Sequence, residues 1–164
     1  MPWVWVSIGS NIDREHYIRA AVTALREGFG ELLLSSVYET PSEGFDGDPF
    51  YNLVVGFPTE LPVEQLHPLM REIEDAHGRV RSGPKFGART LDIDLLTYGD
   101  EVTDRGGKAL PRDEIEKYAF VLGPLAEVAP DECHPQLGVS YQALWEAFDP
   151  AARAALRRVD FDWD

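Results

Sequence analysis

The stretch TLDIDLLTYG, residues 90–99, contains two aspartates within an otherwise apolar run. Residues two apart on a β-strand point to the same face of the sheet, so Asp92 and Asp94 are expected to project together. The alternate leucine and isoleucine residues then point to the opposite face, into the core. Aspartate is disfavoured in strands and two adjacent carboxylates repel each other, which indicates that something positive compensates them.

The rest of the chain alternates between strand-like and helix-like patterns. Further strands are expected at residues 3–9, 31–40 and 50–58, which are rich in β-branched and aromatic residues. A first helix has apolar residues at helical spacing along residues 18–29, and a second helix follows Thr59, which is expected to cap it. After residue 110 the pattern is typical of short helices.

The order of these elements is strand, helix, strand, strand, helix, strand, followed by a helical tail. Split units of this kind build an α+β, ferredoxin-like βαββαβ antiparallel sheet with helices on one face, here with a helical C-terminal extension. The opposite face of the sheet is then expected to be free for a ligand. At 164 residues, we expect a single domain, residues 1–164.

The composition narrows the classes of partner. The chain has 29 acidic and 15 basic residues and a formal net charge of -14, so a nucleic-acid backbone would repel it. Its single cysteine, Cys133, excludes an internal disulfide and a cysteine-based zinc site. The N-terminus has no signal-peptide pattern, and no apolar run is long enough to span a membrane. We expect a monomeric cytoplasmic protein without nucleic-acid or membrane partners.

A cluster of basic residues directly precedes the two aspartates. It comprises Arg79, Arg81, Lys85 and Arg89. Guanidinium groups bind phosphate through paired hydrogen bonds, and two carboxylates without a nearby histidine or cysteine suit Mg²⁺. Alone, the aspartates are more simply an exposed acidic strand, and the basic residues a solvated loop. Together they favour a site for a magnesium–nucleoside triphosphate.

Six segments of the chain together form a recognisable pattern: SIGSN (7–11), SSVYETP (35–41), FYNLVV (50–55), IEDAHGRVR (73–81), FGARTLDIDLLTYG (86–99) and FVLGPLAEVAPD (120–131). With these segments the chain resembles the 6-hydroxymethyl-7,8-dihydropterin pyrophosphokinase family of folate biosynthesis. The resemblance covers the chain from about residue 4 to residue 135. The resemblance implies transfer of the terminal pyrophosphate of ATP, as one unit, to the hydroxymethyl oxygen of the pterin, which leaves the pterin diphosphate and AMP.

The same resemblance implies a role for individual residues. Two Mg²⁺ ions would be held by Asp92 and Asp94, and the residues expected to serve catalysis are Arg79, Arg89, Asp92 and Asp94. The ATP-binding residues would be Glu74, Arg79, Arg81, Lys85, Arg89 and Arg112. The pterin-binding residues would be Thr40, Pro41, Gly44, Phe50, Asn52 and Phe120, with the two phenylalanines on either side of the flat ring.

Two positions depart from the family pattern. Arg112 stands where the family usually has a histidine, and Tyr118 stands where it has an arginine, and both usual residues help to bind the ATP phosphates. Arg112 could supply the missing cation. A second interpretation is therefore a non-catalytic or altered-specificity pterin- or nucleotide-binding paralogue with a degraded ATP clamp. A third interpretation, a ferredoxin-like regulatory module, leaves the paired aspartates without a role.

Overall fold

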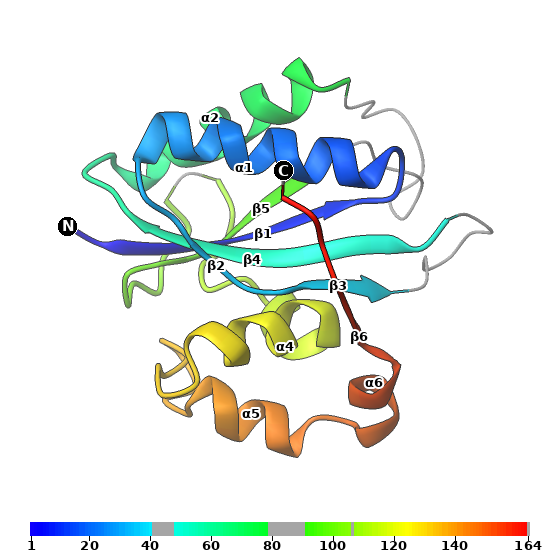
Figure 1. Ribbon diagram of the computed structural model, residues 1–164. Helices are drawn as coiled ribbons and strands as arrows, with labels where there is room; N and C mark the ends of the chain where they lie inside the picture. Colours follow the sequence, from blue (N-terminus) through cyan, green and yellow to red (C-terminus); the bar gives the residue numbers. More distant parts are fainter. Residues whose placement is uncertain (41–47, 79–90, 106, 164) are drawn as a thin grey trace.

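The computed structural model describes residues 1–40, 48–78, 91–105 and 107–163 (Figure 1). Within them, the strands form an antiparallel sheet in the order β5-β1-β4-β3-β6, with the short strand β2 beside β4. The strands are β1 (Trp3–Ser10), β2 (Leu33–Leu34), β3 (Val37–Thr40), β4 (Phe50–Pro58), β5 (Asp92–Tyr98) and β6 (Arg157–Val159).

Helices lie on both sides of this sheet (Figure 1). The long helices α1 (Arg14–Phe29) and α2 (Val63–Ala76) cover one face. The shorter helices lie toward the other face, and they are α3 (Glu114–Lys117), α4 (Ala119–Val128), α5 (Tyr141–Ala147) and α6 (Pro150–Ala155). The α+β, ferredoxin-like antiparallel sheet is confirmed, and the helical C-terminal extension packs against the face opposite α1 and α2.

Two apolar cores follow from the alternation of side chains along the strands. Residues such as Ile8, Leu53 and Leu95 face α1 and α2 in the larger core. Trp5 and Val54 point the other way, into a smaller core with the apolar residues of α4 and α5. The second face of the sheet was expected to be free for a ligand, and α4 covers part of it. The predicted site lies on the remaining part of this face, which extends from Val54 to Phe50 at the beginning of β4.

Three local expectations were wrong. The second helix begins at Val63, with Pro62 at its N-cap, and the Thr59 hydroxyl instead accepts a hydrogen bond from the Leu61 N–H at 3.1 Å. The strand expected at residues 31–40 is divided into β2 and β3, because the Ser35 hydroxyl takes the place of a backbone partner and accepts the Val54 N–H at 2.9 Å. The tail, expected to be helical, also contains the strand β6.

Within the described residues, no helix has both the length and the apolar character that a membrane crossing requires.

Candidate active site

The two aspartates lie side by side on the sheet face opposite α1 and α2. In the register of β5 with β1, Asp92 is opposite Gly9 and Asp94 is opposite Ser7. Ile93, between the two aspartates, is 4% exposed and belongs to the larger core. The predicted orientation of this strand is therefore confirmed: its apolar residues are buried and its carboxylates project together toward the ligand face.

The surroundings of Asp94 disfavour its ionised form. Burial and the neighbouring Asp92 carboxylate raise the pKa of Asp94 from its ordinary 3.8 to about 7, although the Arg112 guanidinium acts in the opposite direction. The Asp94 side chain is 27% exposed, so the carboxylate remains accessible from solvent. A carboxylate in this state gains from a nearby cation, because a positive charge relieves the repulsion that its ionisation creates.

Arg112 is a basic residue that the structure places beside Asp94. Its backbone N–H donates to the Leu96 carbonyl at 2.9 Å, which holds this segment beside β5. The guanidinium contacts Glu114 at 2.6 Å through Nη2 and lies 3.7 Å from Asp94 Oδ1 through Nη1. The side chain is only 16% exposed. The cation that replaces the family's histidine thus lies next to the predicted metal ligands, while a contact with ATP stays a prediction.

Glu74, predicted to approach the nucleotide, has a structural contact as well. It lies on α2, is 4% exposed, and its Oε2 accepts a hydrogen bond from the Ile93 N–H at 2.7 Å. This bond connects α2 to β5 between the two aspartates, and it fixes the edge of the strand that presents them. Sequence reasoning missed it, because the two partners are 19 residues apart in the chain. The predicted role of Glu74 in ATP binding stays untested.

The predicted pterin-binding residues of β4 lie two strands from the aspartates. Asn52 of β4 is opposite Gly9 of β1, which is in turn opposite Asp92 of β5. Asn52 is 5% exposed and its Nδ2 donates to Thr40 Oγ1 at 2.9 Å. Thr40 pairs with Phe50 across β3 and β4. Asn52 and Phe50, both predicted to bind the pterin, therefore lie on adjacent rows of one sheet face.

The absence of a side chain at Gly9 leaves space beside Asn52 and Phe50 on this sheet face. A Cβ atom at Gly9 would lie 2.7 Å from Asn52 Oδ1 and 3.7 Å from Phe50 Cδ1. A side chain there would displace the Asn52 amide or block the surface beside it. The sequence signal for this position was the SIGSN segment, although its glycine was not singled out as a site residue.

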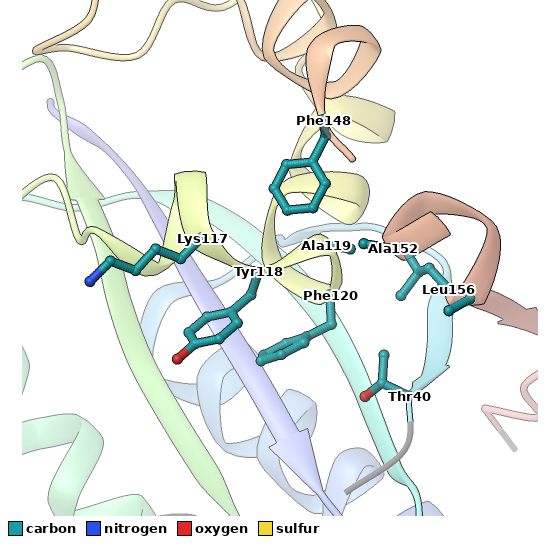
Figure 2. A pocket seen from close by; sticks show the side chains of 9 residues that line it. Thr40, Lys117, Tyr118, Ala119, Phe120, Phe148, Ala152 and Leu156 are labelled. Carbon is teal, nitrogen blue, oxygen red and sulfur yellow. The ribbon is translucent and has the colours of Figure 1, made fainter. Parts of the chain in front are cut away.

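Phe120 projects from the beginning of α4 into a pocket of about 190 Å³ (Figure 2). Thr40 of β3 lines the same pocket, so these two predicted pterin-binding residues share one cavity. The full lining is Thr40, Lys117, Tyr118, Ala119, Phe120, Phe148, Ala152, Ala155 and Leu156. The contribution of α6 was missed, because this segment lies beyond the motifs that carry the family resemblance.

The described part of the chain thus brings several predicted site residues to one face of the sheet or its border: Thr40, Phe50, Asn52, Glu74, Asp92, Asp94, Arg112 and Phe120. The other predicted residues lie outside the described residues: Pro41, Gly44, Arg79, Arg81, Lys85 and Arg89. Among the residues that are described, no three histidine, cysteine, aspartate or glutamate side chains are grouped to hold a metal ion. Two carboxylates with substrate phosphates and water are nevertheless a usual Mg²⁺ environment.

The family model of 7,8-dihydro-6-hydroxymethylpterin-pyrophosphokinase matches residues 5–130 of the chain. This chain belongs to that family. It is 40% identical over 165 residues to the 2-amino-4-hydroxy-6-hydroxymethyldihydropteridine pyrophosphokinase of Methylorubrum extorquens. The aligned region covers 98% of this chain and 100% of the relative. The enzyme of the same name from Aquifex aeolicus is 35% identical over 137 residues, with 82% of this chain and 85% of the relative covered.

Solved structures agree on the fold. A crystal structure of HPPK-DHPS in complex with substrates superposes with a TM-score of 0.76 at 11% identity, and covers 96% of this chain and 46% of that chain. The wild-type HPPK-DHPS of Plasmodium falciparum gives a TM-score of 0.69 at 14% identity, with 89% and 44% covered. The chain therefore spans somewhat less than half the length of these structures, and the likeness supports the architecture of the pyrophosphokinase part.

Proposed function

We propose that this chain transfers the pyrophosphoryl group of ATP to the hydroxymethyl group of 6-hydroxymethyl-7,8-dihydropterin, with AMP as the second product. The family assignment and the relatives named as this pyrophosphokinase support the proposal. The comparisons give no support to the alternative of a non-catalytic or altered-specificity paralogue.

One observation in this structure supports the proposal most directly. Asp92, Gly9 and Asn52 are paired residues on three adjacent strands, and they form one row across the sheet. Neighbouring strands are about 4.8 Å apart, so the aspartate and amide backbones are separated by roughly 10 Å. A pterin whose edge contacts Asn52 can extend its hydroxymethyl group along this row. That group then comes close to phosphates held at the aspartates.

We propose that Asp92 and Asp94 hold the Mg²⁺ that accompanies ATP, with two ions expected. A Mg²⁺ ion held there would supply positive charge to the phosphate oxygens of ATP. The chain contributes the two carboxylates on one rigid strand, and Arg112 beside them adds positive charge for the triphosphate. Catalysis is then positioning and charge neutralisation, without a covalent intermediate on the protein.

The remaining roles follow from the resemblance and are part of the same proposal. Phe50 and Phe120 stack on the two faces of the pterin, and its edge is bound by Thr40, Pro41, Gly44 and Asn52. The triphosphate is contacted or enclosed by Glu74, Arg79, Arg81, Lys85 and Arg89. We also propose that the enzyme is a cytoplasmic monomer, and a solution mass of 18.4 kDa by light scattering would support the monomer.

The reaction products test this function. The protein is incubated with ATP, Mg²⁺ and 6-hydroxymethyl-7,8-dihydropterin, and the nucleotides are separated by chromatography. We expect AMP in equal amount to the pterin diphosphate, and neither product when the pterin is omitted or EDTA is added. ADP as the pterin-dependent product would contradict pyrophosphoryl transfer, and the absence of any pterin-dependent product would favour the binding paralogue.

A further inference from the structure

We infer that Tyr118 is a positioning residue that holds the ring of Phe120 in place for the pterin. This inference rests on the proposed function. The two rings are stacked, with centroids 4.9 Å apart and an angle of 19° between their planes (Figure 2). The family pattern has an arginine at the position of Tyr118, so a contact of two aromatic rings here is a feature of this chain.

The backbone of Tyr118 is fixed on both sides. It ends α3, where its N–H donates to the Glu114 carbonyl at 3.1 Å. It also precedes α4, where its own carbonyl accepts the N–H groups of Val121 at 3.1 Å and Leu122 at 3.0 Å. The residue therefore joins two helices through three hydrogen bonds, and its side chain leaves the backbone from a well-defined position.

The extended conformation of Tyr118 makes the ring contact possible. Side chains two residues apart do not meet on a helix. Tyr118 is not helical, because its φ of -122° and ψ of 127° are those of an extended residue. Its ring can therefore lie parallel to that of Phe120, which is two residues further along and already in α4.

This stack determines which side of Phe120 is available. A separation of 4.9 Å is direct contact between rings, so a planar ligand does not fit between them. Phe120 and Tyr118 both line the pocket that contains Thr40, whose hydroxyl accepts a hydrogen bond from the Asn52 amide. The pterin therefore stacks on the face of the Phe120 ring that Tyr118 leaves uncovered, while Tyr118 supports the other face.

The energetic benefit is preorganisation. A phenylalanine that is already fixed loses less rotamer freedom when a ligand stacks on it, and the affinity rises without a new contact to the ligand. Tyr118 carries no positive charge at the position of the family's phosphate-binding arginine. In this chain the position thus supports the pterin, while Arg112 beside Asp94 provides a cation at the phosphate side.

Calorimetric titration of two ligands tests this assignment. The probes are 6-hydroxymethyl-7,8-dihydropterin and a non-hydrolysable ATP analogue with Mg²⁺. For Tyr118→Ala we expect the pterin Kd to rise about 3- to 10-fold, in line with the usual strength of an aromatic pair. Tyr118→Phe keeps the ring and is expected to restore the wild-type value. The Kd of the ATP analogue is expected to stay within about twofold in both variants.

A control variant and three possible outcomes test whether Tyr118 positions Phe120. Tyr17→Ala removes a tyrosine of similar partial burial from α1, on the opposite face of the sheet, and should change neither Kd. An unchanged pterin Kd in Tyr118→Ala would overturn the inference. Equal losses for both ligands would also overturn it, and so would a Tyr118→Phe variant as weak as Tyr118→Ala, because the hydroxyl rather than the stack would then matter.

A measurement without ligands separates this inference from the proposed function. Unfolding midpoints are compared for Tyr118→Ala, Phe120→Ala and the double variant. Contacting rings should give a double variant whose loss of stability is smaller than the sum of the two single losses. If the wild type binds neither ligand, the proposed function fails, and additive losses in this cycle would still show that Tyr118 does not hold Phe120.

Discussion

Replacement of Asp94 by asparagine should stabilise the protein in the absence of metal, and the gain should depend on pH. The folded state raises the pKa of Asp94 from 3.8 to about 7, so between these values the folded chain binds a proton that the unfolded chain releases. The free energy of unfolding of the wild type therefore falls as pH rises through this window. The amide that replaces the carboxyl group in Asp94→Asn cannot ionise, so the variant escapes this loss.

The magnitude follows from the size of the shift. Each pKa unit corresponds to about 1.36 kcal/mol, so a shift of roughly three units sets an upper limit of about 4 kcal/mol. Solvent reaches 27% of the Asp94 side chain and screens the repulsion, so we expect about 1–3 kcal/mol at pH 8. Arg112 retains its 2.6 Å contact with Glu114 in the variant, so its guanidinium is not left without a carboxylate.

Urea unfolding with EDTA, at pH 4 and at pH 8, measures this difference. The stability of Asp94→Asn relative to the wild type should be close to zero at pH 4 and clearly positive at pH 8. Asp100→Asn is the matched control, because Asp100 lies in the exposed turn after β5. A difference that is the same at both pH values, or an Asp94→Asn variant that is less stable at pH 8, would refute the electrostatic reasoning.

Three further substitutions test the packing and the pterin platform. Gly9→Ala places a Cβ 2.7 Å from Asn52 Oδ1 and should raise the pterin Kd about tenfold with little change for ATP; calorimetry that finds both ligands unaffected would exclude a role for this row. Gly56→Ala brings a Cβ into the Trp5 ring, and urea unfolding should show a loss of about 1–3 kcal/mol in the free energy of unfolding. Unchanged stability would contradict the close packing at this position. Phe120→Ala should weaken pterin binding by about 1–3 kcal/mol and ATP binding far less, and equal losses would mean that Phe120 only packs the core.

The sequence predicted the parts of the fold that depend on local periodicity. The alternation around Asp92 and Asp94 was sufficient to orient β5, because a strand with leucine and isoleucine on one side has only one way to bury them. The order of strands and helices indicated the antiparallel sheet for a similar reason. The division of the strand at residues 31–40 was not predictable in this way, since it depends on a hydroxyl of Ser35 that bonds to β4.

The candidate site was predictable where it depends on motifs, and less so where it depends on distant contacts. Asn52 was singled out through the family resemblance, and its amide, which needs a partner within a strand, finds one in Thr40. The bond between Glu74 and the Ile93 N–H, and the wall that α6 adds to the pocket, join segments whose proximity only the folded chain reveals. The stack of Tyr118 on Phe120 likewise depends on an extended residue between two helices, and residue spacing alone would not place the rings together.

The most direct test of the account is the Mg²⁺-dependent, pterin-dependent formation of AMP by Asp92→Asn and Asp94→Asn, measured beside the wild type and Asp100→Asn. Each substitution at the proposed metal ligands removes a charged oxygen donor, so we expect both variants to lose at least roughly 100-fold in turnover while remaining folded. Asp100→Asn should keep the wild-type rate, because this residue lies in the exposed turn beyond the sheet face. Full Mg²⁺-dependent activity in both Asp92→Asn and Asp94→Asn would contradict the claim that this pair of carboxylates holds the metal for pyrophosphoryl transfer.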